Sequence, residues 1–102
     1  MKNKKNSYVG LSCGGMASKK FHEQVQHVAN QAIPSMDSSA CYKTKEIYGK
    51  KAWGKMSIDE RCAAENCMVD IAIHITVMLE FVGETPKGFA LFSKRDPDTL
   101  DL

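Results

Sequence analysis

Ser57-Ile58-Asp59-Glu60 opens the stretch that decides the fold, which continues through Leu79-Glu80-Phe81-Val82 to Phe89-Ala90-Leu91-Phe92. A serine followed three residues later by glutamate is a capping box, because each side chain can accept a hydrogen bond from the other residue's backbone N–H. It predicts a helix that begins at residue 58. The two later runs are rich in strand-forming residues and flank Gly83-Glu-Thr-Pro-Lys-Gly88, which is typical of a hairpin with a longer turn. The whole stretch therefore predicts a helix that leads into a β-hairpin.

No glycine or proline marks the end of this helix. Its predicted buried stripe consists of side chains at helical spacing, namely Ile58, Ala64, Cys67, Met68 and Ile71. Further on, apolar residues alternate with more polar ones, as in a half-buried strand, at Ile73, Ile75, Val77, Leu79 and Phe81. We therefore expect the helix to reach residues 72–74 and to give way to strand between residues 72 and 78.

An earlier helix is predicted over residues 18–33. Its apolar stripe is formed by Phe21, Val25, Val28 and Ala32. Ser18 is the predicted N-cap, and Pro34 ends the helix because the residue before a proline is pushed out of the α region. His22 and His27 are five residues apart, so they do not share a face, and we expect both to face solvent.

A short strand is predicted at residues 41–43, with a second helix after it. Thr44 is the predicted N-cap of this helix. Gly49 and Gly54 are expected to shorten it, because glycine is a poor helix former. Four aromatic side chains are expected in the core: Trp53, Phe81, Phe89 and Phe92.

The predicted order is helix, short strand, helix, longer helix, strand, turn and strand. This is the order of a winged helix-turn-helix domain, with the hairpin as the wing. We therefore predict a single α+β domain over residues 18–94, winged helix-turn-helix-like, with three helices and a C-terminal β-hairpin wing. Residues 1–17 are predicted to form a basic, flexible N-terminal arm, and residues 95–102 an acidic tail.

Four short motifs give the chain a family resemblance: Ile47-Tyr48-Gly49, Trp53, Glu60-Arg61-Cys62-Ala63-Ala64 and Leu79-Glu80-Phe81-Val82-Gly83. Through them, about residues 44–94 resemble small phage-type winged-helix-like proteins, most of which are uncharacterised. The shared residues are mainly structural. The resemblance therefore implies the fold and, by analogy, an accessory protein of a mobile element that acts on a host complex.

The composition is that of an ordinary globular chain, with 102 residues, 43% of them apolar and 25% charged. The first five residues, Met1-Lys-Asn-Lys-Lys5, resemble the start of a signal peptide, but no apolar segment follows them. We therefore expect a cytoplasmic protein. Its four cysteines lack Cys-x-x-Cys spacing, so we expect free thiols and no metal or other cofactor.

The charge is divided unevenly along the chain. Residues 1–55 carry ten lysines and three acids, a net charge of +7, whereas residues 56–102 carry four basic residues and nine acids, a net charge of −5. Such asymmetry indicates an interaction face. Two other interpretations stay open: complementarity of the two halves within the fold, and head-to-tail pairing of the halves in a homodimer.

The third helix carries the charge that decides between functions. In a winged helix that reads DNA this helix enters the major groove, yet here Arg61 is its single basic residue. Carboxylates aimed at phosphates would be costly. We therefore predict a non-enzymatic module that binds a protein, as an adaptor or inhibitor. Its candidate contacts are Asp59, Arg61, Glu65 and Asp70.

The alternative is a DNA-binding winged-helix regulator that uses the basic half of the chain. Its phosphate contacts would be Lys45, Lys50, Lys51, Lys55 and Lys87, together with the arm from Lys2 to Lys5. An enzyme would need a cysteine nucleophile with His22, His27 or His74 as its base. No local motif supports such a pair, so we predict no catalytic residue and no small-molecule substrate.

Overall fold

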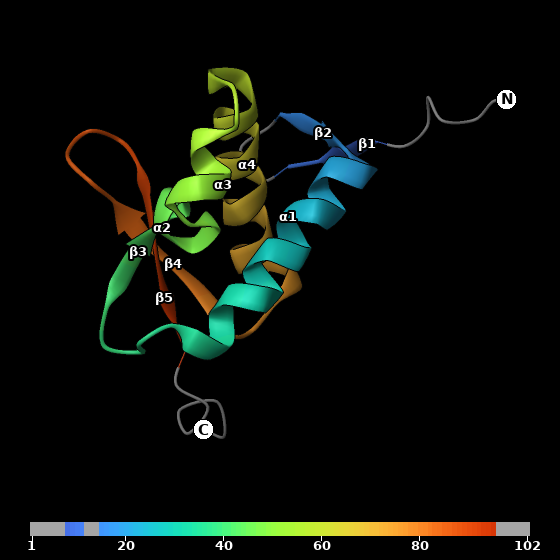
Figure 1. Ribbon diagram of the computed structural model, residues 1–102. Coiled ribbons are helices and arrows are strands. Elements are labelled where there is room, and N and C mark those ends of the chain that lie inside the picture. The colour runs from blue at the N-terminus through green and yellow to red at the C-terminus, as the bar shows by residue number, and fades with distance from the viewer. Residues whose placement is uncertain (1–7, 12–14, 96–102) are drawn as a thin grey trace, which may run out of the picture.

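The computed structural model describes residues 8–11 and 15–95 and has an α+β architecture that ends in a β-hairpin (Figure 1). This confirms the predicted fold class at that level. The elements in chain order are β1 (Tyr8–Gly10), β2 (Met16–Ser18), α1 (Lys19–Ala32), the 3₁₀ turn η2 (Ile33–Ser35), β3 (Cys41–Lys43), α2 (Thr44–Tyr48), α3 (Lys50–Gly54), α4 (Ile58–Asp70), the π-helical turn η3 (Ile71–Ile75), β4 (Leu79–Glu84) and β5 (Ala90–Lys94).

Three antiparallel strands form a sheet beside the helices, in the order β3-β5-β4 (Figure 1). Phe92 in the central strand pairs with Tyr42 on one side and with Phe81 on the other. The predicted strand at residues 41–43 and the predicted hairpin are both confirmed. The hairpin turn is shorter than predicted, because β4 continues to Glu84 through a bulge at Gly83, whose φ is +144°.

Helix α1 begins and ends as predicted. The Ser18 side chain accepts a hydrogen bond from the Phe21 N–H at 3.1 Å, and the α-helix stops at Ala32, two residues before Pro34. Its buried face is turned slightly from the predicted stripe, because the fully buried positions are His22, Val25 and Ala29. Phe21, Val28 and Ala32 pack at the margin of the core and are partly buried.

The predicted second helix is in fact two short helices. Gly49 has a φ of +93° and separates α2 from α3. The prediction that Thr44 caps α2 is wrong: Lys43 is the N-cap residue, and its backbone N–H donates to Glu46 Oε1 at 2.7 Å. Thr44 is instead the first helical residue and is buried at 1% exposure.

Helix α4 begins with the predicted capping box. Glu60 N–H donates to Ser57 Oγ at 3.1 Å, and Ser57 N–H donates to Glu60 Oε1 at 2.8 Å. The helix then widens into the π-helical turn η3, and strand β4 starts at Leu79. The change from helix to strand therefore falls where predicted. The alternating residues Ile73, Ile75 and Val77 nevertheless lie before β4 and are exposed.

The first strands add a small hairpin that the sequence does not predict. Strands β1 and β2 pair antiparallel and contact α1, and Leu11 and Ala17 are both buried, at 8% exposure. The described part of the predicted N-terminal arm is thus folded against the domain. Lys2 to Lys5 of that arm, and residues 96–102 of the predicted acidic tail, lie outside the described residues. Among the described helices, none is long and apolar enough to cross a membrane.

Candidate functional site

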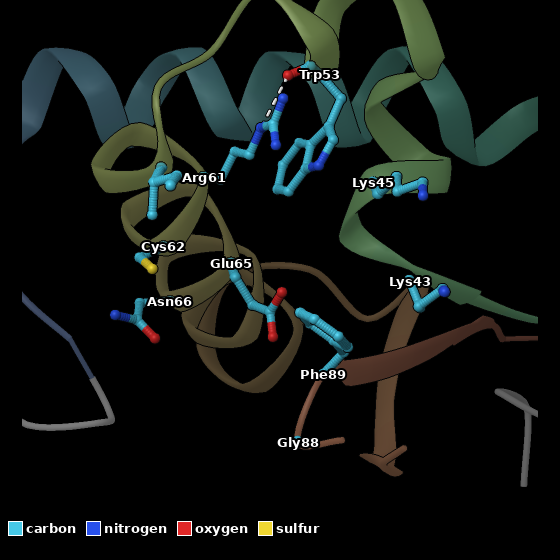
Figure 2. Close-up of a pocket in the computed structure, with 10 residues that line it drawn as sticks. Lys43, Lys45, Trp53, Arg61, Cys62, Glu65, Asn66, Gly88 and Phe89 are labelled. Atoms are coloured by element: carbon cyan, nitrogen blue, oxygen red, sulfur yellow. Dashed lines mark hydrogen bonds between the residues drawn. The ribbon is translucent and has the colours of Figure 1, made fainter. Parts of the chain in front are cut away.

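A groove of about 580 Å³ opens between α4 and the turn of the β4–β5 hairpin. Figure 2 shows Trp53 of α3 at one end, Phe89 at the other, and Lys43 and Lys45 across from α4. Helix α4 contributes five side chains to it, namely Ile58, Arg61, Cys62, Glu65 and Asn66. We refer to this cavity as the α4–hairpin groove.

The five α4 residues form one face of the helix, because they recur at the spacing i, i+3, i+4, i+7 and i+8. The opposite face is the core stripe, in which Ala64, Cys67, Met68 and Ile71 are buried as predicted. The prediction that Ile58 belongs to the core stripe is wrong, since this side chain is 75% exposed. The sequence carries a signal for this position, because Ile58 precedes Glu65 by about two helical turns and therefore lies on the same face of α4.

Trp53 is fixed in the groove wall by two neighbours. Arg61 Nε donates to the Trp53 carbonyl at 3.1 Å, and the Arg61 guanidinium lies 5.7 Å from the centre of the indole ring (Figure 2). The Tyr48 ring packs against the same indole, with centroids 5.4 Å apart and planes tilted by 59°. Trp53 is therefore partly buried, as an edge of the core rather than its centre.

Glu65 ties α4 to the hairpin. Its Oε2 accepts a hydrogen bond from the Ala90 N–H at 2.9 Å. This N–H lies just beyond the end of β3, whose last residue pairs with Leu91. The carboxylate thereby takes the place of the backbone acceptor that a longer β3 would offer to this N–H. It also holds Phe89, the residue before Ala90, at the mouth of the groove. Phe89 is 48% exposed, so the prediction that it is a core residue is wrong.

Asp70 is not a surface residue. It is 5% exposed, and its Oδ2 lies 3.0 Å from Nε2 of His22, which is 3% exposed. The prediction that His22 faces solvent is therefore wrong as well. The cause is the packing of α1 against α4, which brings residues 48 positions apart into contact. His27, by contrast, is exposed as predicted.

The four predicted protein contacts thus separate. Arg61 and Glu65 line the groove, and Asp59 is exposed in the first turn of α4 without lining it. Asp70 faces the core on the other side of the helix. The structure therefore brings two of the four side chains together. The groove also contains Lys43, Ile58 and Phe89, which sequence reasoning did not place at a site.

The predicted phosphate contacts separate too. Lys45 lines the groove, whereas Lys50 and Lys51 are exposed on α3 and Lys55 is exposed just after it. Lys87 is exposed in the hairpin turn. Of these five lysines, the structure places one in the groove.

Two side chains outside the lining of the groove, those of Tyr48 and Asp37, have shifted pKa values. Burial, and to a smaller extent the nearby Cys67 thiol, raises the pKa of Tyr48 to about 12, so its hydroxyl stays protonated at neutral pH. Hydrogen bonds from the backbone N–H and the hydroxyl of Ser39 lower the pKa of the Asp37 carboxyl.

Of the cysteines in the described chain, Cys41 and Cys62 are exposed and Cys67 is buried. Cys13 lies outside the described residues. Within residues 8–11 and 15–95, no group of three or more His, Cys, Asp or Glu side chains is arranged to hold a metal ion.

Comparison of the chain with models of known protein families, with curated proteins and with solved structures found no match.

Proposed function

We propose that this chain is a non-enzymatic protein-binding module, an adaptor or inhibitor, that docks its partner in the α4–hairpin groove. The observation that carries the proposal is the apolar surface of the groove, where Ile58 is 75% and Phe89 48% exposed. Large apolar side chains on the walls of a concave site are typical of a surface that a partner covers. Exposed aromatic residues that can enter a desolvated contact are also the usual anchors of interfaces.

The proposed fold type is winged helix-turn-helix-like. Its support is the sheet order β3-β5-β4, in which β3 lies between the first two helices in sequence and pairs with the second strand of the hairpin. In this arrangement α4 is the helix that would read DNA. Its groove face begins with Ile58 and carries Arg61 and Glu65, whose charges are opposite, with Asp59 beside it. Such a face suits a protein surface better than a row of phosphates.

The resemblance to small phage-type proteins extends this proposal to a biological role. On that analogy, the module is an accessory protein of a mobile element and its partner is a component of a host complex. Because fold alone does not fix function, this role rests on the resemblance and the partner must be identified by binding.

The proposal is tested by quantitative affinity capture with matched surface variants. Ile58→Glu places a charge on the groove wall, while Val77→Glu places the same charge outside it, at a side chain that is 64% exposed. We expect a partner captured by the wild type to be retained by Val77→Glu and reduced about tenfold by Ile58→Glu. If both variants are folded, as judged by circular dichroism, and capture the partner equally, the partner does not bind in the groove.

Binding to DNA is the second candidate function, and one observation favours it. Because Asp70 is buried beside His22, α4 presents one carboxylate fewer to phosphates than its sequence indicates. Lys45, Lys50, Lys51, Lys55 and Lys87 then supply exposed or groove-lining positive charge around it.

An anisotropy titration against labelled duplex and single-stranded DNA at two salt concentrations separates the two candidates. A protein-binding module should show no binding to either DNA at low salt. A DNA-binding module should show affinity that falls steeply with salt. In that case Lys50→Glu with Lys51→Glu should weaken binding and reduce the salt slope by about 2.

A further inference from the structure

We infer that the α4–hairpin groove takes an acidic segment of the partner protein that also carries apolar anchor side chains. This inference rests on the proposed protein-binding function and specifies the chemistry of its partner. Three features of the groove carry it. Two lysine ammonium groups have no ion-pair partner among the described residues. The one carboxylate of the lining is hydrogen-bonded to the hairpin backbone, and apolar side chains lie at both ends.

Lys43 and Lys45 supply the unpaired positive charge. Both line the groove on the wall across from α4 (Figure 2). Among the described residues, the one ion pair closer than 4.0 Å is that of His22 with Asp70, so neither ammonium group is matched by a carboxylate of this part of the chain. A bound carboxylate could therefore pair with either lysine without displacing an internal partner.

The remaining charges of the groove belong to its walls. Arg61 donates from Nε to the Trp53 carbonyl and covers the indole ring. Glu65 accepts from the Ala90 N–H at 2.9 Å. The lining thus carries three positive charges, on Lys43, Lys45 and Arg61, against the single carboxylate of Glu65, so the field that a ligand meets between the walls is positive.

The apolar residues restrict the class of ligand further. Ile58 and Phe89 are both exposed side chains that line the groove, and Trp53 closes one end (Figure 2). A volume of about 580 Å³ is within the usual range for pockets that hold apolar groups. Nucleic acid offers such walls little beyond thymine methyl groups and base faces. A peptide that combines carboxylates with leucine or aromatic side chains matches both features.

The inference is tested by selecting peptides on the full-length protein. The ligands are displayed random peptides of about twelve residues, which span up to about 40 Å when extended and so can cover the groove. Trp53 is the single tryptophan of the chain, and its fluorescence reports directly on occupancy of the groove. We expect selected peptides to be enriched in Asp and Glu together with Leu, Phe or Trp.

Matched charge reversals then locate the contact. Lys43→Glu with Lys45→Glu should weaken the selected peptides about tenfold, since two attractions become repulsions. Lys50→Glu with Lys51→Glu carries the same change in net charge on α3, outside the groove, and should change affinity less than about twofold. Lys45→Glu alone, at an exposed side chain, provides the test if the double groove variant fails to fold.

Three results would overturn the inference. Selection of basic or neutral peptides that still depend on Phe89 and Ile58 would leave the proposed groove function standing but refute the acidic partner. Peptides that bind all charge variants equally, or no groove-dependent peptide at all, would contradict the inference and the proposed site together. A change in Trp53 fluorescence with duplex DNA, lost in the Lys43→Glu, Lys45→Glu variant, would assign the groove to nucleic acid.

Discussion

Asp70 and His22 form the most deeply buried charged contact of the described chain, with Gln26 completing it. Gln26 Nε2 donates to Nδ1 of the imidazole at 3.0 Å. The ring hydrogen is therefore on Nε2, which points at the Asp70 carboxylate 3.0 Å away. A satisfied polar group between two helices fixes their relative position, because any shift would leave it buried without a partner. This contact accordingly sets how α1 packs on α4.

Replacing Asp70 by alanine should destabilise the fold by about 3 kcal/mol, because it leaves His22 buried without its acceptor. Urea unfolding followed by circular dichroism measures this loss. Glu23→Ala is the matched control, since Glu23 is exposed on α1 next to His22, and should change stability by less than about 0.5 kcal/mol. Similar losses in the two variants would show that Asp70 is solvated.

Tyr48 makes stability depend on alkaline pH. Its pKa is raised to about 12 from 10.0, so the folded state keeps the phenol proton at pH values where the unfolded state has lost it. The stabilisation is therefore complete below about pH 10 and is lost as the pH rises toward 12. In unfolding experiments, the stability of the wild type relative to Tyr48→Phe should fall between about pH 10 and about pH 12. A constant difference would mean that the hydroxyl titrates alike in both states.

At the scale of elements, the break between α2 and α3 is set by one glycine. No atom lies within 4 Å of the place where a Cβ would be, either at Gly49 or at Gly54. The two differ in backbone conformation, because Gly49 has a φ of +93° and Gly54 does not have a φ in this left-handed range. Gly49→Ala should therefore cost about 1–2 kcal/mol through backbone strain alone. Gly54→Ala should be neutral or stabilise by about 0.5 kcal/mol. Thermal or urea unfolding of the two variants measures these changes in stability. Equal changes in Gly49→Ala and Gly54→Ala would exclude backbone strain at Gly49.

The link between α4 and the hairpin depends on the Glu65 carboxylate. Removing it in Glu65→Ala leaves the Ala90 N–H without its acceptor and should cost about 1 kcal/mol. Amide hydrogen exchange should accelerate at Ala90 more than at the centre of β5, near Phe92. Glu84→Ala, at an exposed residue of β4, should leave both amides unchanged. Unaltered exchange at Ala90 in Glu65→Ala would show that the hairpin is held by the sheet alone.

Which elements could be predicted depends on how local their signals are. The Ser57–Glu60 capping box and the two halves of the hairpin are encoded within a few residues, so their positions follow from the sequence. The burial of His22 and Asp70 depends on a contact across 48 positions, and a single sequence carries no local signal for it. The groove lies between: Arg61 and Glu65 of its α4 wall were predicted contacts, but Ile58 was predicted in the core, and the place of Lys43 and Phe89 required the β3–β5 pairing.

At the scale of the whole molecule, the basic and acidic halves of the chain do not form separate parts of the fold. The basic half contributes α1, α2 and β3, and the acidic half contributes α4 and the hairpin. Strand β3 pairs with β5, and α1 packs on α4, so the two halves interleave in one core.

The N-terminal hairpin decides where the domain begins. Leu11 and Ala17 are buried at 8% exposure, and the Leu11 N–H donates to the Gly15 carbonyl at 2.8 Å. Deleting residues 1–17 should therefore lower the free energy of unfolding by about 2–4 kcal/mol, mainly through lost apolar burial. The deletion keeps Ser18, the N-cap of α1, so the loss cannot be assigned to an uncapped helix. Deleting residues 1–7 retains both strands, and the difference between the two truncations in urea unfolding isolates the hairpin. Equal stability of the two would mean that the domain starts at α1 and that β1 and β2 contribute nothing to its core.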